Sequence, residues 1–85
     1  MKHPLRIQWL DSARSEVRKL QQPLAMRIFA AVQEFAQSGR GDIKPLHGEL
    51  SDALRLRVGE YRVLFTHEDG TMRIFGVRHR SEAYR

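Results

Sequence analysis

Cysteine is absent from this 85-residue chain. Its absence excludes disulfides, thiolate metal ligands and a cysteine nucleophile, and it suits a reducing compartment. Apolar residues nowhere approach the run of roughly 20 that a membrane-spanning helix needs. The four histidines, at positions 3, 47, 67 and 79, lack the spacing of metal ligands. We therefore expect a cytoplasmic protein with no membrane association, no metal and no cofactor.

Lysine is also scarce, since 12 of the 15 basic residues are arginine, and the formal net charge is +5. Excess positive charge implies an anionic partner. Guanidinium groups favour planar, bidentate contacts with phosphate or carboxylate, so nucleic acid or an acidic peptide fits best. A genome rich in arginine codons would produce the same composition. The positions of the arginines must therefore decide between the two explanations.

The length limits the chain to one compact domain, which we expect to span residues 1–85. Hydrophobic residues make up 41% of the chain, enough for a modest core. A domain of this size has little stability to spare, so a partner that binds its folded state would stabilise it appreciably.

The first half of the chain predicts a strand followed by two helices. Apolar and polar residues alternate over 5–9, as in a half-buried strand. Asp11 or Ser12 is expected to cap a helix whose apolar residues fall on one face. A second helix begins near Pro23 and ends at Gly39, which suits a left-handed C-terminal position. The short connection predicts an antiparallel helical hairpin. Residues 39–53 are predicted to form a long loop.

The last third changes to the alternating pattern of strands. Gly59 and Glu60 predict a two-residue hairpin turn with glycine first. Asp69 and Gly70 predict a second turn, and a final strand runs from Met72 to about residue 80. The predicted fold is α+β, with an N-terminal strand, a helical hairpin packed on one sheet face, and a three-stranded antiparallel meander.

The Gly59–Glu60 turn brings two arginines together. It pairs Arg57 with Arg62, and strand alternation places both, with Arg55, on the face opposite the apolar residues. Like charges directly opposite each other cost up to about 1 kcal/mol. An anion that docks on this face would offset that cost, whereas a merely solvated face would not need the arrangement. A two-residue turn at Asp69 would put Arg62 and Arg80 on opposite faces, and a three-residue loop would put them on the same face. A phosphate site that includes both arginines requires the second register.

Two segments resemble the RelE/ParE superfamily of toxins: LRLRVGEYRVLF at residues 54–65 and VRHRSEAY at residues 77–84. The likeness extends back through the helices and residues 41–46, nearly the whole chain. It implies the toxin of a toxin–antitoxin pair, bound by a cognate antitoxin and, through it, to operator DNA. In the RelE-like branch it implies metal-independent cleavage of mRNA on the ribosome, by attack of a ribose 2′-hydroxyl on the adjacent phosphate.

The resemblance also implies roles for individual residues. By position, Arg62 and Arg80 match arginines that contact the scissile phosphate, and Tyr84 matches a tyrosine that stacks on a base. Arg55 and Arg57 match basic residues that are lysines in some relatives. Arginine keeps its proton near neutral pH, so these two are expected to act electrostatically, and the general base stays unassigned. The catalytic set is thus Arg57, Arg62, Arg80 and Tyr84, with RNA contacts from Arg55, Arg78 and Lys44.

Two other functions stay open. A ParE-like toxin would bind and poison DNA gyrase without chemistry of its own. An inactive toxin would serve only as a regulatory binding module with its antitoxin. His79 has the right chemistry for proton transfer, but strand alternation turns it away from Arg78 and Arg80.

Overall fold

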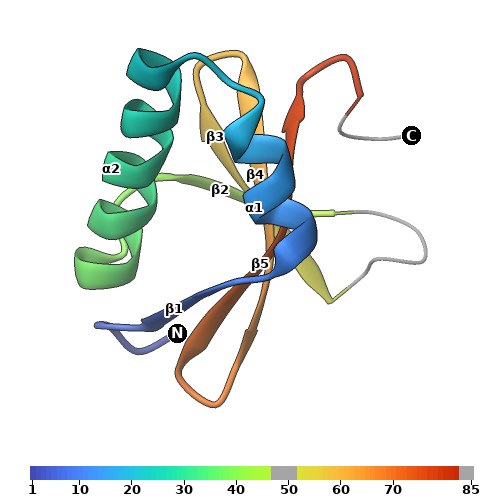
Figure 1. The fold of residues 1–85 in the computed structure, drawn as a ribbon. Coiled ribbons are helices and arrows are strands. Elements are labelled where there is room, and N and C mark those ends of the chain that lie inside the picture. The colour runs from blue at the N-terminus through green and yellow to red at the C-terminus, as the bar shows by residue number, and fades with distance from the viewer. Residues whose placement is uncertain (47–51, 83–85) are drawn as a thin grey trace.

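The computed structural model describes residues 1–46 and 52–82. Seven elements follow one another along the chain (Figure 1). In order they are β1 (Arg6–Trp9), α1 (Asp11–Arg18), α2 (Gln22–Ser38), β2 (Asp42–Pro45), β3 (Ala53–Val58), β4 (Tyr61–Glu68) and β5 (Thr71–His79). Among the described residues, no helix is long and apolar enough to cross a membrane.

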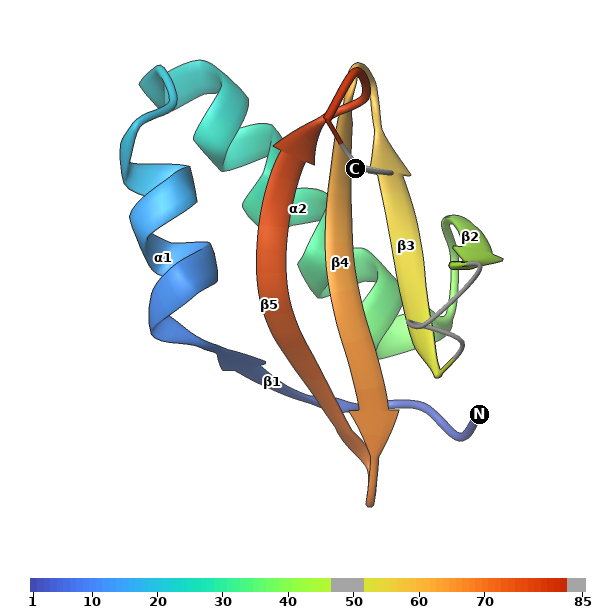
Figure 2. The ribbon, with the colours of Figure 1, turned by 90° about the vertical axis from the view of Figure 1, so that its right-hand side faces the viewer.

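All five strands form one sheet in the order β1-β5-β4-β3-β2. β1 runs parallel to β5, and the other neighbouring strands are antiparallel. In Figure 1, α2 lies to one side of this sheet, whereas α1 lies along β5, the strand that its side chains contact. In Figure 2, which is turned by 90° from Figure 1, β3, β4 and β5 stand in front of α2, while α1 lies beside β5. The predicted α+β class is confirmed. We call the side turned toward the viewer in Figure 2 the helix-free face, since no described helix covers it.

The helices form as their sequences predict. The apolar stripe of α2 buries Ile28, Val32 and Phe35. Gly39 ends this helix with φ +83°, and its amide donates to the Phe35 carbonyl, so the predicted left-handed glycine is confirmed. The predicted cap of α1 is wrong. Leu10 holds the cap position without a side-chain hydrogen bond, because the Ser12 hydroxyl donates to a carbonyl of β5 instead.

The predicted loop over residues 39–53 needs correction, because it contains strand β2. Ile43 pairs with Leu56 and Lys44 with Arg55. The strand is short, mostly exposed and ends at Pro45, which has no amide to donate. Those are the properties of an edge strand. Because the strand is so short and exposed, its sequence shows no clear alternation of apolar and polar residues.

The main core lies between the helices and the sheet. Its largest fully buried side chains come from α2 and from β3, β4 and β5: Ile28, Val32, Leu56, Val63, Phe65, Met72 and Ile74. Burial of each such side chain stabilises the fold by about 1.5–3 kcal/mol relative to exposure. A smaller cluster of Leu46, Ala53 and Leu64, with Phe75 against it, lies apart from this core. Leu64 pairs with Arg55, so this cluster belongs to the helix-free face.

Both predicted turns are present. Val58 pairs with Tyr61 across a turn in which Gly59 has φ +60°. Asp69 and Gly70 form the second turn with φ +50° and +73°, the signs that a type I′ hairpin requires. Further along the chain from this second turn, β5 carries a β-bulge. Phe65 pairs with Ile74 but Leu64 pairs with Gly76, so Phe75 is the extra residue.

Candidate nucleic-acid interface

Three arginines form a row across β3, β4 and β5, at the end of the sheet beside the Gly59 turn. Arg57 on β3 pairs with Arg62 on β4, and Arg62 pairs with Arg78 on β5. Residues that pair directly have their side chains on the same face. The predicted pairing of Arg57 with Arg62 is confirmed. We call these three residues the arginine row.

The partner of Arg62 on β5 is Arg78 and not Arg80. The two-residue turn alone would have paired Arg62 with Val77 and turned Arg78 away from the helix-free face. The bulge at Phe75 adds one residue to β5 and reverses the facing of every residue after it. The bulge therefore has the effect expected of a three-residue loop: even-numbered residues near the end of β5 share the face of Arg62.

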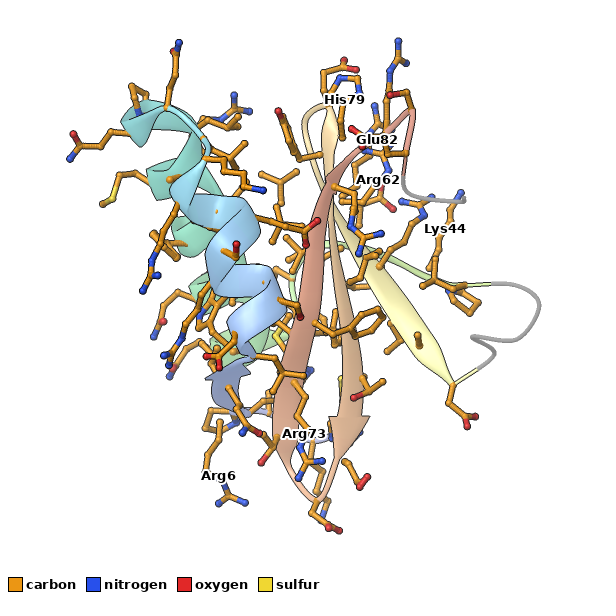
Figure 3. The ribbon with its side chains drawn as sticks, turned by 45° about the vertical axis from the view of Figure 1, so that its right-hand side comes forward. Arg6, Lys44, Arg62, Arg73, His79 and Glu82 are labelled. Carbon is orange, nitrogen blue, oxygen red and sulfur yellow. The ribbon has the colours of Figure 1, made fainter. Side chains whose placement is uncertain are left out.

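A second row of paired residues lies beside the first. Lys44 on β2 pairs with Arg55 on β3, Arg55 pairs with Leu64, and Leu64 pairs with Gly76. Lys44 and Arg62 are therefore on the same face, and Figure 3 shows both on the side of the sheet away from the helices. Five of the seven residues expected to touch RNA thus share this face: Lys44, Arg55, Arg57, Arg62 and Arg78.

Two of these guanidinium groups are unusual because they are buried. Arg55 and Arg62 each keep only 9% of their surface exposed. Arg62 Nη1 donates to the carbonyls of Gly59 and Tyr61, both at 3.1 Å. Arg62 Nε and Arg55 Nη1 have no acceptor among residues 1–46 and 52–82. A buried charged donor without an acceptor is costly, because its lost hydration is not replaced. An acceptor supplied by a ligand would remove this cost.

The remaining members of the arginine row differ in their partners. Arg57 is exposed, and its Nε lies 3.5 Å from the Gly59 carbonyl, at the outer limit of a hydrogen bond. Arg78 Nε donates to Glu16 Oε2 at 2.6 Å. Glu16 lies on α1, far from Arg78 in sequence, and no sequence pattern pointed to this contact.

Arg80 is placed differently from its expected role. It follows the end of β5, where its amide donates to the Glu60 carbonyl at 2.7 Å. Its Nε lies 2.7 Å from the Glu60 carboxylate, and both side chains are exposed. The structure thus places Arg80 at the rim of the arginine row, already paired with a carboxylate.

His79 faces the helices, as alternation predicts. It pairs with Tyr61, and the two rings meet edge to face with centroids 5.4 Å apart. Its Nδ1 lies 3.0 Å from the Ser81 hydroxyl. Tyr84, the residue expected to stack on a base, lies outside the described residues. Within the described part of the chain, no group of three or more histidine, aspartate or glutamate side chains has a geometry that could hold a metal ion.

The chemistry available here follows from these placements. The helix-free face offers positive charge and N–H donors, and two of its guanidinium nitrogens are buried without an acceptor among the described residues. The apolar cluster of Leu46, Ala53, Leu64 and Phe75 adjoins them. Charges beside apolar groups interact more strongly with a ligand than charges in open water. Because arginine does not act as a base near neutral pH, the row can bind an anion and stabilise developing charge but cannot accept a proton.

A family model and a curated relative both relate this chain to toxins. Residues 7–84 match the family model described as the ParE toxin of the type II toxin–antitoxin system parDE. The toxin RelG of Mycobacterium tuberculosis is 36% identical over 92 residues, covering 96% of this chain and 98% of RelG. The similarity therefore extends over nearly the whole length of both chains.

Solved structures of the same fold support this assignment. The toxin–antitoxin complex RelBE2 of Mycobacterium tuberculosis contains a chain with a TM-score of 0.79 and 26% identity, covering 89% of this chain and 98% of that one. A chain of the RelE–RelB complex of Pyrococcus horikoshii has a TM-score of 0.75 at 19% identity, covering 94% and 99%, and shows the same fold. The protein therefore belongs to the RelE/ParE family of toxins from type II toxin–antitoxin systems.

Proposed function

We propose that this toxin is a ribosome-dependent endoribonuclease that binds the scissile phosphate of mRNA on the helix-free face. Cleavage proceeds by attack of the ribose 2′-hydroxyl on the adjacent phosphate. No metal takes part in this proposal. The similarity to RelG and to RelE-type chains supports the RelE-like branch.

One observation carries the proposal: two arginines of this face are nine-tenths buried and have guanidinium nitrogens without an acceptor among the described residues. A fold selected only for stability would avoid this, because unpaired buried charges destabilise it. The cost becomes understandable when a phosphate supplies the missing oxygens. Arg62 Nη1 donates to carbonyls of the turn, whereas its buried Nε has no acceptor among the described residues and is the atom that we propose to bond the phosphate. The turn thus fixes the guanidinium before any ligand arrives.

The proposed division of labour follows from position. Arg62, between its two neighbours in the row, contacts the scissile phosphate together with Arg55. Arg57 and Arg78 stabilise the negative charge that builds up on the phosphate in the transition state. Lys44 holds a flanking phosphate, and Tyr84 stacks on a base. Arg80 reaches the leaving oxygen only when its exposed ion pair with Glu60 opens, which costs little in water.

We further propose a cognate antitoxin that occupies this face with acidic side chains. The solved relatives include toxin–antitoxin complexes. A partner that supplies carboxylates satisfies the same buried donors as RNA and so competes with RNA directly. Its affinity is expected to fall as salt is raised. An affinity that does not change with salt would contradict this electrostatic mode.

A second function is supported by a specific observation, the match to the ParE family model over residues 7–84. Under this alternative the toxin binds DNA gyrase and traps it on cut DNA. The basic face would then contact gyrase or its DNA without catalysing a reaction.

Two assays run side by side separate these functions. The first follows cleavage of a defined mRNA on programmed ribosomes, and the second follows DNA breaks made by gyrase. We expect cleaved mRNA in the first, abolished by Arg62→Ala and weakened by Tyr84→Phe, and no effect in the second. Gyrase-dependent breaks that persist in both variants, with intact mRNA, would refute the nuclease and support the gyrase poison.

A further inference from the structure

Helix α1 takes the place of a missing strand along half of β5. β1 pairs with Thr71 to Ile74, so the later part of β5 has no strand neighbour on that side among residues 1–46 and 52–82. The Ser12 hydroxyl donates to the Phe75 carbonyl at 2.7 Å, and Glu16 Oε1 accepts from the Val77 amide at 2.9 Å. Figure 2 shows α1 beside this part of β5. Two side chains of α1 thus bond backbone groups that a sixth strand would otherwise pair.

The spacing of the two side chains explains why a helix can do this. Four residues of α-helix rise about 6 Å, and two residues of a strand rise about 6.7 Å. Ser12 and Glu16 are four residues apart on α1, and Phe75 and Val77 are two residues apart on β5. One turn of the helix therefore matches one repeat of the strand.

Glu16 does more than cover the strand edge, because its second oxygen bonds the arginine row. Oε2 accepts from Arg78 Nε at 2.6 Å, a short charge-assisted hydrogen bond. A Cβ built on Gly76 would lie 3.5 Å from Arg78 Nη2 and 3.4 Å from Glu16 Oε1. Gly76 continues the row of Arg55 and Leu64 on the helix-free face. The Arg78 guanidinium therefore reaches along this face over a glycine that leaves room for it.

We propose that Glu16 is a positioning residue for Arg78, and through it for RNA bound to the arginine row. This inference rests on the proposed function, because RNA is taken as the ligand. The carboxylate is anchored by the Val77 amide and holds Nε, which leaves the terminal nitrogens of Arg78 for a phosphate. A guanidinium fixed before binding loses less conformational entropy when the ligand arrives.

The affinity of Glu16→Gln for RNA distinguishes two roles of Glu16. If the carboxylate positions Arg78, its loss weakens binding; if it only neutralises Arg78, its loss strengthens binding. Replacing Glu16 with glutamine removes one negative charge, which by itself strengthens binding to a polyanion. Loss of positioning acts in the opposite direction. Glu34→Gln is the matched control, because it also removes one carboxylate charge, from an exposed pair with Arg40 at 3.6 Å on α2. Both variants raise the formal net charge from +5 by one.

The experiment measures the affinity of the full chain for a short, 2′-O-methylated single-stranded RNA, which cannot be cleaved. Wild type, Glu16→Gln, Arg78→Ala and the double variant form a cycle, with thermal melts to verify folding. We expect Glu16→Gln to bind about tenfold more weakly, as for loss of one charge-assisted hydrogen bond. Glu34→Gln should bind as tightly as wild type or tighter. In the Arg78→Ala background, Glu16→Gln should not weaken binding further and should show only the charge effect that Glu34→Gln shows.

Arg78→Lys serves as a second variant in case Glu16→Gln does not fold. It keeps the charge but loses the Nε that Glu16 holds, so we expect it to bind as weakly as Glu16→Gln. Tighter binding by Glu16→Gln, additive losses in the cycle, or wild-type affinity for Arg78→Lys would each overturn the inference. The same variants are then tested on programmed ribosomes. The expected affinities without any mRNA cleavage would refute the nuclease and keep the positioning role, whereas cleavage with unchanged affinities would do the reverse.

Discussion

Replacing Arg62 with alanine tests the centre of the arginine row most directly. The change removes the hydrogen bonds from Nη1 to the Gly59 and Tyr61 carbonyls, each worth about 1 kcal/mol to stability. It also removes repulsion from Arg57 and Arg78, which lie directly opposite on both sides. That relief offsets up to about 1 kcal/mol for each pair. The free energy of unfolding should therefore fall by about 1 kcal/mol, and by no more than about 2 kcal/mol.

Activity should respond far more than stability. A preorganised donor that contacts the transition state contributes about 2–4 kcal/mol, so we expect cleavage on programmed ribosomes to slow by about 30-fold to 1000-fold. Single-turnover rates of mRNA cleavage, measured with saturating toxin, check this value. Arg73→Ala is the control, since it removes the same charge from an exposed side chain at the other end of the sheet (Figure 3). A rate within about threefold of wild type, in a variant that melts normally, would exclude Arg62 from the site.

Three further changes test the surroundings of the arginine row. Gly59→Ala should lower the free energy of unfolding by about 1 kcal/mol, because φ is +60° there; an unchanged melting temperature would contradict this strain. Gly76→Ala should cost about 1 kcal/mol and weaken RNA binding, because a Cβ would lie 3.3 Å from Leu64 Cδ1; wild-type affinity would show that the neighbours adjust freely. Phosphate at ten times its dissociation constant should stabilise the wild type by about 1.4 kcal/mol but leave Arg62→Ala unaffected, and equal stabilisation by chloride at matched ionic strength would refute a specific anion site.

Much of the fold could be predicted because its signals are local. The stripe of α2 ends at a glycine that has the expected left-handed conformation. Gly59 fixes the first hairpin, and its two-residue turn alone determines that Arg57 meets Arg62. Strand β2 was missed because a short edge strand with one exposed side carries little alternation. The parallel pairing of β1 with β5 depends on contacts between the two ends of the chain, which local patterns do not encode.

The arrangement of the candidate site could be predicted only in part, because the rest depends on tertiary contacts that local sequence patterns do not encode. Arg57, Arg62 and Arg55 follow from a single turn, whereas the neighbour of Arg62 on β5 depends on a bulge that no glycine or proline at position 75 announces. The burial of Arg55 and Arg62 is a tertiary property, so a sequence pattern could show their face but not their unpaired nitrogens. The contact between Glu16 and Arg78 likewise spans most of the chain.

The extra residue at Phe75 divides β5 into two segments of opposite parity. Before it, even-numbered positions such as Met72 and Ile74 point to the core; after it, odd-numbered positions such as Val77 do. Removing that single residue would turn Arg78 toward the core and Val77 toward the helix-free face. A homologue without this bulge would have one residue fewer in the strand, so aligning it with this chain without a gap at position 75 would compare inward residues with outward ones.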